Sequence, residues 1–134
     1  MMKVILQQHL GSDFIVESAG LSRDLAGRPA NYRSVACMRE RGVDLSGHMS
    51  RWIGDLDFDL YRWIVCVGQE EADKVRSILH ADRARIMVAN EQHGSIPDPY
   101  ESGMAGYRRC VDLLDQVMPG IAEQIRESSE TMWR

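Results

Sequence analysis

The feature that most constrains the fold is an unbroken apolar run at residues 63–67, Trp-Ile-Val-Cys-Val, bounded by an arginine and a glycine. Five apolar residues in succession leave no polar face, so the run predicts a strand buried on both sides, as in a parallel sheet. A second strand is predicted at residues 85–89 and a shorter one at residues 14–16. Because helical patterns separate these runs, we predict an α/β fold with a mostly parallel sheet.

Four helices are predicted, at residues 1–10, 31–41, 70–79 and 103 to about 126. Gly11 and Gly42 follow the first two as natural stops. Pro119 lies inside the longest pattern, where a proline kinks or divides a helix. We predict one α/β domain over residues 1–127, followed by a frayed tail at residues 128–134.

The composition argues against several kinds of partner. The formal net charge of −4 argues against a nucleic-acid surface, because such surfaces need a basic excess. No apolar stretch is long enough for a membrane span, and the four histidines lack metal-ligand spacing, so neither a membrane partner nor a metal is expected. The three cysteines are widely spaced and odd in number, which indicates a reducing cytoplasm rather than a disulfide scaffold.

The polar loop before the longest predicted helix contains the sequence Pro97, Asp98, Pro99, Tyr100. A carboxyl group held between two prolines, beside a phenol, suits a positioned general acid. The alternative is structural, because Asp-Pro pairs favour turns and aspartate also caps helices. Both interpretations are open at this point.

Four segments, in this order, resemble the low-molecular-weight protein tyrosine phosphatase family. They are residues 17–20 (Glu-Ser-Ala-Gly), residues 44–51 with the pattern Ser-Gly-His-x-x-Arg, the Phe-Asp pair at 58–59 before the apolar run, and the loop with Asp98. The resemblance covers nearly the whole chain, from about residue 2 to about residue 125.

The resemblance implies a three-layer α/β fold and hydrolysis of phosphotyrosine through a cysteinyl-phosphate intermediate, with no cofactor and a phosphotyrosine protein as partner. It assigns Asp98 as the general acid that protonates the leaving tyrosine, and Tyr100 as part of the phosphotyrosine pocket. Ser18 and His48 brace the catalytic loop in that family; for His48 a plain hydrogen-bonded histidine is the favoured interpretation. Arg51 is expected to be a solvated surface charge.

The nucleophile of that family is a cysteine followed by five residues and an arginine, and this chain contains no such sequence. Six positions after Cys37, Cys66 and Cys110 stand valine, alanine and glutamine. Thiolate attack on phosphorus therefore has no candidate here, and we predict no phosphatase activity for the chain as written.

Three hypotheses follow. The first is an N-terminally truncated reading frame of a true phosphatase, because residues 1–6 resemble the helix that follows the missing loop. The second is a genuine non-catalytic homologue that acts as a binding or regulatory module. The third is an arsenate-reductase-like protein, which needs the same loop together with resolving cysteines.

The resemblance also has a structural consequence. In the family the strand before the nucleophile lies inside the sheet, so about three strands remain here. Because unpaired backbone groups are costly to bury, these strands are expected to repack or to be completed by a second copy in a homodimer.

Overall fold

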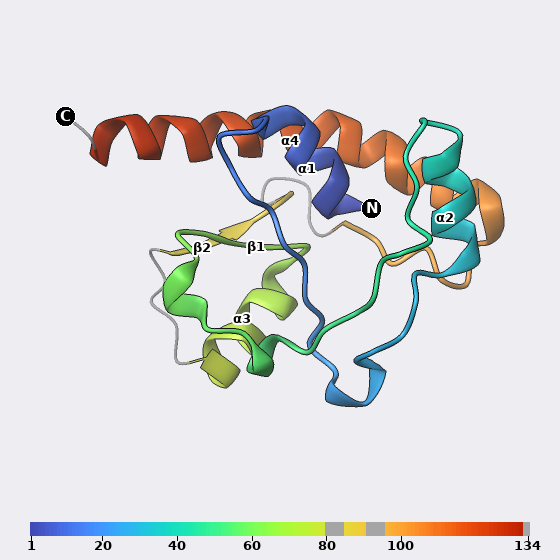
Figure 1. The fold of residues 1–134 in the computed structure, drawn as a ribbon, viewed down its shortest axis with the longest axis horizontal. Helices are drawn as coiled ribbons and strands as arrows, with labels where there is room; N and C mark the ends of the chain where they lie inside the picture. Colours follow the sequence, from blue (N-terminus) through green and yellow to red (C-terminus); the bar gives the residue numbers. More distant parts are fainter. Residues whose placement is uncertain (80–84, 91–95, 133–134) are drawn as a thin grey trace.

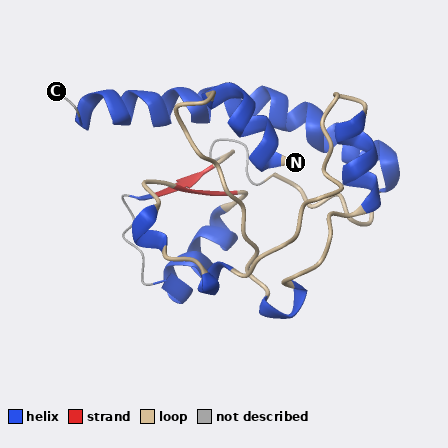
Figure 2. Cartoon of the chain, in the orientation of Figure 1, coloured by secondary structure: helices blue, strands red, loops and turns tan. Residues whose placement is uncertain are grey.

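The computed structural model describes residues 1–79, 85–90 and 96–132. In these ranges four helices and two strands follow one another: α1 Met2–Leu10, α2 Tyr32–Arg39, β1 Ile64–Cys66, α3 Gln69–Leu79, β2 Ile86–Val88 and α4 Gly103–Met132. Short 3₁₀ turns lie at Arg23–Leu25, Ile53–Asp55 and Phe58–Leu60. Figure 1 shows α1 and α4 on one side of the strands and α3 on the other, and Figure 2 shows the long loops between α1 and β1. The predicted α/β class is confirmed.

The sheet is one parallel pair within the described ranges. β1 pairs with β2 in the register Ile64–Ile86, Val65–Met87 and Cys66–Val88. α3 makes the crossover between the two strands, as a parallel connection requires. Both predicted apolar runs are therefore strands, each shorter by a residue at either end than the run itself.

The prediction of a strand at residues 14–16 is wrong. The segment pairs with no strand in the described ranges, and Ile15 is 85% exposed. The side-chain amide of Gln7 serves this backbone instead: Nε2 donates to the Phe14 carbonyl (2.7 Å) and Oε1 accepts from Val16 N–H (2.8 Å). A side chain thus takes the place of a neighbouring backbone, and among the described residues the sheet has two strands where about three were expected.

The helices follow the predicted patterns more closely. α1 is followed by Gly11, whose φ of 78° lies in the left-handed region that glycine tolerates. At the start of α2 the Asn31 side chain accepts a hydrogen bond from Arg33 N–H (2.9 Å). α4 passes Pro119 without a break and continues beyond residue 126 to Met132. Pro119 is exposed, so the carbonyl that it leaves without an intrahelical partner is on the side that water reaches.

Two apolar clusters hold the layers together. The larger joins α1, α2 and α4, and its most deeply buried side chains are Ile5, Met38, Leu114 and Met118. The smaller joins the sheet to α3 through Ile53, Cys66, Ala72 and Val75. Full burial of one aliphatic side chain contributes ~1.5–3 kcal/mol. The larger cluster is therefore the main source of stability, and α4 supplies much of it.

Leu114→Ala tests this role of α4. Because Leu114 is 1% exposed, we expect the free energy of unfolding to fall by ~2–5 kcal/mol, measured by urea denaturation followed by circular dichroism. Leu25→Ala is the matched control, since Leu25 is 51% exposed and should cost less than ~1 kcal/mol. Equal losses in the two variants would contradict the assignment of the core.

Candidate active site

The loop that carries Asp98 is attached at both ends. Ile96 N–H donates to the Val67 carbonyl (2.7 Å), so the described part of the loop starts beside the end of β1. Ser102 N–H donates to the Pro99 carbonyl (2.9 Å), directly before α4 begins at Gly103. The carboxyl ends of parallel strands are where open α/β sheets bind ligands. The loop therefore lies at the edge where a site is expected.

Asp98 is exposed, and its side chain closes a turn. Its Oδ1 accepts a hydrogen bond from Tyr100 N–H (3.0 Å), which is the geometry of an Asx turn. Asp98 therefore has the turn role that the Asp-Pro pair predicts. The turn engages a single carboxylate oxygen and holds the side chain at the surface, so it is compatible with an acid role.

Two tyrosines lie near Asp98 in different environments. Tyr100 is 63% exposed, whereas Tyr107, on the first turns of α4, is 3% exposed. Burial raises the pKa of Tyr107, and the negative charge of Asp98 raises it further. The Cys110 thiol donates a long hydrogen bond to the Pro97 carbonyl (3.8 Å), which attaches the loop to α4. Asp98 therefore lies over the buried start of α4, with Tyr100 facing solvent.

His48 is partly buried and has a lowered pKa. Burial is the largest cause, followed by the positive charges of Lys3 and the Met1 amino group, and then of Arg51. Each of these charges disfavours a second cation at the imidazole. His48 is therefore held neutral near the beginning of α1, which suits a hydrogen-bonding histidine.

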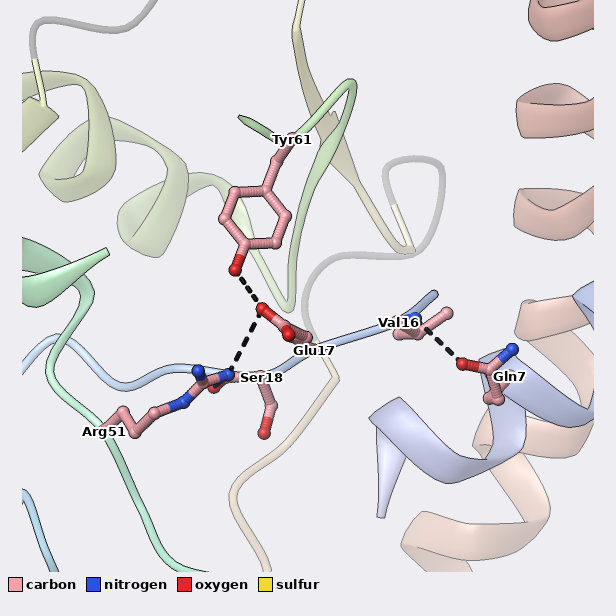
Figure 3. Close-up of polar contacts among 6 residues, drawn as sticks. All are labelled: Gln7, Val16, Glu17, Ser18, Arg51 and Tyr61. Atoms are coloured by element: carbon pink, nitrogen blue, oxygen red, sulfur yellow. Dashed lines mark hydrogen bonds and ion pairs between the residues drawn. The ribbon is translucent and has the colours of Figure 1, made fainter. Parts of the chain in front are cut away.

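Figure 3 shows a polar cluster, the Glu17 cluster, formed by Glu17, Ser18, Arg51 and Tyr61. The Glu17 carboxylate accepts a hydrogen bond from the Tyr61 hydroxyl and lies 3.6 Å from the Arg51 guanidinium. Arg51 also donates to the Ser18 carbonyl (3.2 Å). The pKa of Glu17 is lowered, mainly by the Tyr61 hydrogen bond and then by Arg51.

The Glu17 cluster corrects the expectation for Arg51, which is tied to residues 17 and 18 rather than simply solvated. Ser18 takes part through its backbone carbonyl. The sequence pattern placed residues 17–20 and Arg51 in the same motif set, but nothing in the sequence relates Tyr61 to Glu17, because that contact spans two loops.

The amino group at the beginning of α1 affects two of the groups described above. The Met1 amino group acts on the pKa of His48 and also on that of the Cys110 thiol, which Asp98 affects as well. His48 therefore lies near the Met1 amino group, and the Cys110 thiol lies near both that amino group and the Asp98 carboxylate. Ser18 is connected to this region through Arg51, which is one of the charges that affect His48.

The three cysteines are free and buried. Burial raises the pKa of the Cys37 and Cys110 thiols, and it raises that of Cys66 to about 11. A nucleophilic cysteine needs the opposite, a pKa lowered by nearby positive charge or a helix N-terminus. These three thiols are therefore structural.

In the described ranges no three His, Cys, Asp or Glu side chains gather closely enough to hold a metal ion. None of the helices in the same ranges combines the length and the apolar character that crossing a membrane requires.

A comparison with protein-family models matches residues 1–131 to the family described as "Low molecular weight phosphotyrosine protein phosphatase". The human low molecular weight phosphotyrosine protein phosphatase is 31% identical over 120 residues, which cover 81% of this chain and 75% of the human protein. This chain belongs to the low-molecular-weight phosphotyrosine protein phosphatase family.

Two solved structures share this fold. Vibrio vulnificus Wzb in complex with benzylphosphonate matches with a TM-score of 0.82 and 23% identity, over 92% of this chain and 87% of that one. The tyrosine phosphatase Wzb from Escherichia coli K30, in complex with sulphate, gives a TM-score of 0.82 and 21% identity over the same shares. At these identities the likeness establishes the fold alone.

Alkylation measures the state of the thiols. A pKa of about 11 for Cys66, against an ordinary value of 9.0, lowers its thiolate fraction at pH 8 by about 100-fold. We expect iodoacetamide to label Cys66 in the native protein at least that much more slowly than in urea, as followed by mass spectrometry. Labelling of any of the three cysteines at the unfolded rate would show an exposed, reactive thiol.

His48 should make stability depend on pH. Its folded pKa is lowered, so the unfolded chain binds a proton more readily. The contribution is fully present above the unfolded pKa of about 6.5 and is lost as the pH falls towards the folded value. Urea titrations at pH 7.5 and pH 5 should show a smaller loss for His48→Gln than for the wild type. His9→Gln is the control, and an identical loss in all three proteins would contradict the expectation.

Proposed function

We propose that this chain carries the general acid of a tyrosine phosphatase site, Asp98, and does not hydrolyse phosphotyrosine by itself. One contrast supports the proposal above all. The Asp98 carboxylate is exposed on an attached loop, while every cysteine is buried, with a raised pKa and no arginine six positions on.

The chemistry shows why an acid alone is insufficient. In cysteine-dependent hydrolysis a thiolate attacks phosphorus, the bond from phosphorus to the phenol oxygen breaks, and an acid gives that oxygen a proton. Backbone N–H groups and an arginine hold the phosphoryl oxygens meanwhile. Asp98 suits the proton transfer, which contributes typically ~10²–10⁴-fold. The nucleophile and the phosphate cradle have to come from outside these 134 residues.

A second candidate is a non-catalytic module that binds a phosphotyrosine protein. It is favoured by the exposed Tyr100 ring beside Asp98 and by the positive charges of Lys3 and Arg51 that act on His48. An aromatic ring and cations are the groups that recognise a phosphorylated phenol. The three free thiols fit the reducing cytoplasm as the place of action.

An activity assay tests the first proposal. The purified chain should release p-nitrophenol from p-nitrophenyl phosphate at the rate of buffer, while an active family member measured in parallel turns over. Asp98→Asn is the control variant, because it removes the acid and keeps an oxygen that can close the turn. Turnover above buffer that falls in Asp98→Asn would show that the chain is a phosphatase without an added nucleophile.

Calorimetry separates the two candidates. A phosphotyrosine peptide is titrated into the chain beside the same peptide with plain tyrosine. Binding of the phosphorylated form alone favours the binding module, and absence of binding by both peptides excludes it.

A further inference from the structure

Two adjacent parts of the surface carry opposite charge. The first, the basic lobe, consists of residues 20–33 and 49–52 and contains four arginines and one aspartate. The second, the acidic turn, consists of residues 55–60 and contains three aspartates and no basic residue. Figure 1 shows the 3₁₀ turn Arg23–Leu25 of the lobe, in light blue, and the acidic turn, in green, on the same lower side of the molecule.

Backbone hydrogen bonds hold the two stretches of the basic lobe together. Gly20 N–H donates to the Arg51 carbonyl (2.7 Å), and Gly27 N–H donates to the Ser50 carbonyl (2.8 Å). Ser50 N–H in turn donates to the Arg28 carbonyl (2.8 Å). The lobe is therefore a fixed platform for the side chains that it exposes.

Three arginines of the basic lobe have no acidic partner in the described ranges: Arg23, Arg28 and Arg33. Two of them rest on aromatic rings instead. The guanidinium of Arg23 lies 5.3 Å from the centre of the Trp52 ring, and that of Arg33 lies 4.7 Å from the centre of the Tyr32 ring. A guanidinium on an aromatic face keeps the N–H groups at its edge for a carboxylate.

The acidic turn presents carboxylates that are equally available. All three aspartates are exposed, and Asp55 and Asp57 have no basic partner among the described residues. Asp59 has one long contact, at 3.9 Å from Arg85. The Asp57 side chain accepts a hydrogen bond from Asp59 N–H (3.2 Å), which fixes the shape of the turn. Within one copy the two faces therefore leave their charges unused.

Both faces also expose large apolar side chains between the charges. Leu25 and Met49, on the basic lobe, are 51% and 53% exposed, and Leu60, at the end of the acidic turn, is 78% exposed. Apolar side chains surrounded by charged ones are the usual composition of a protein–protein interface. The chain thus carries two faces that match in charge and in apolar content.

We propose that the basic lobe of one copy of this chain docks on the acidic turn of a second copy, and that the reciprocal contact forms in the same dimer. Because the two faces are adjacent, a two-fold axis between them brings each lobe against the other copy's acidic turn and closes the assembly. Opposite charges across the contact also orient the encounter of the two copies. β1 belongs to neither face, so this dimer differs from one that would complete the sheet.

Sedimentation velocity over a series of chain concentrations tests the role of charge. At an ionic strength of about 0.01 M, where exposed charges act over ~30 Å, we expect a concentration-dependent dimer. At about 1 M, where they act over ~3 Å, we expect a monomer. A monomer at every concentration in low salt overturns the proposal. So does a dimer that survives high salt, because apolar contacts or a completed sheet would then hold it.

Reversal of the charges on one face at a time locates the contact. One variant combines Arg23→Glu with Arg28→Glu, and the other combines Asp55→Lys with Asp57→Lys. Each variant alone places like charges opposite each other, so its dimer dissociation constant should rise at least about tenfold. An equimolar mixture should dimerise again, because the two reversed faces match each other and the two unchanged faces also match. A mixture that stays monomeric overturns the proposal.

The control variant combines Arg39→Glu with Arg109→Glu. It changes the net charge as much as the lobe variant does, at two exposed arginines outside both faces, so its dimer should persist. Equal loss of the dimer in the control and in the lobe variant shows that net charge alone governs association, which overturns the proposal. Asp98 lies in neither face, so failure here leaves the proposed function untouched, and failure of the proposed function leaves this dimer untouched.

Discussion

The packing of α1 against α4 is the contact on which the rest of this structure depends. Ile5 of α1 and the stripe of Leu114 and Met118 on α4 are almost completely excluded from water. α2 joins the same cluster through Met38, and ion pairs from Arg41 to Asp115 and from Glu40 to Arg108 reinforce that edge. Because these pairs are exposed they add little, and apolar burial supplies most of the stability.

The candidate site takes its position from this core. The acid loop is attached to the end of β1 by Ile96 and enters α4 at Gly103, so two rigid elements determine where Asp98 lies. Burial of Tyr107 and Cys110 beneath the loop connects it to the same helix that forms the core. The Met1 amino group, at the beginning of the helix α1 that packs on α4, affects the pKa of both His48 and the Cys110 thiol beneath this loop.

The sheet that packs on this core is one parallel pair in the described ranges, and a groove lies beside β1. Helices cover both faces of the two strands, yet β1 has a pairing partner on one side only within the described ranges (Figure 1). The chain thus keeps a scaffold of the phosphatase family and a presented carboxylate, while its thiols serve as core residues. The side chains of Gln7, Tyr61 and Arg51 hydrogen-bond to residues 14–18, as a neighbouring strand would in a full sheet.

The sequence by itself determined the fold class, the four helices and two of the strands, because continuous apolar runs and helical periodicity are local signals. It also determined the family and the position of Asp98 between two prolines. It was wrong about residues 14–16, because three apolar residues form a strand only when a neighbouring backbone is available, and Gln7 took that place. Pro119 likewise did not divide α4, because buried residues on either side of it keep the helix on the core. The Glu17–Tyr61 contact, the lowered pKa of His48 and the groove beside β1 depend on residues far apart in the chain, so only the tertiary structure decided them.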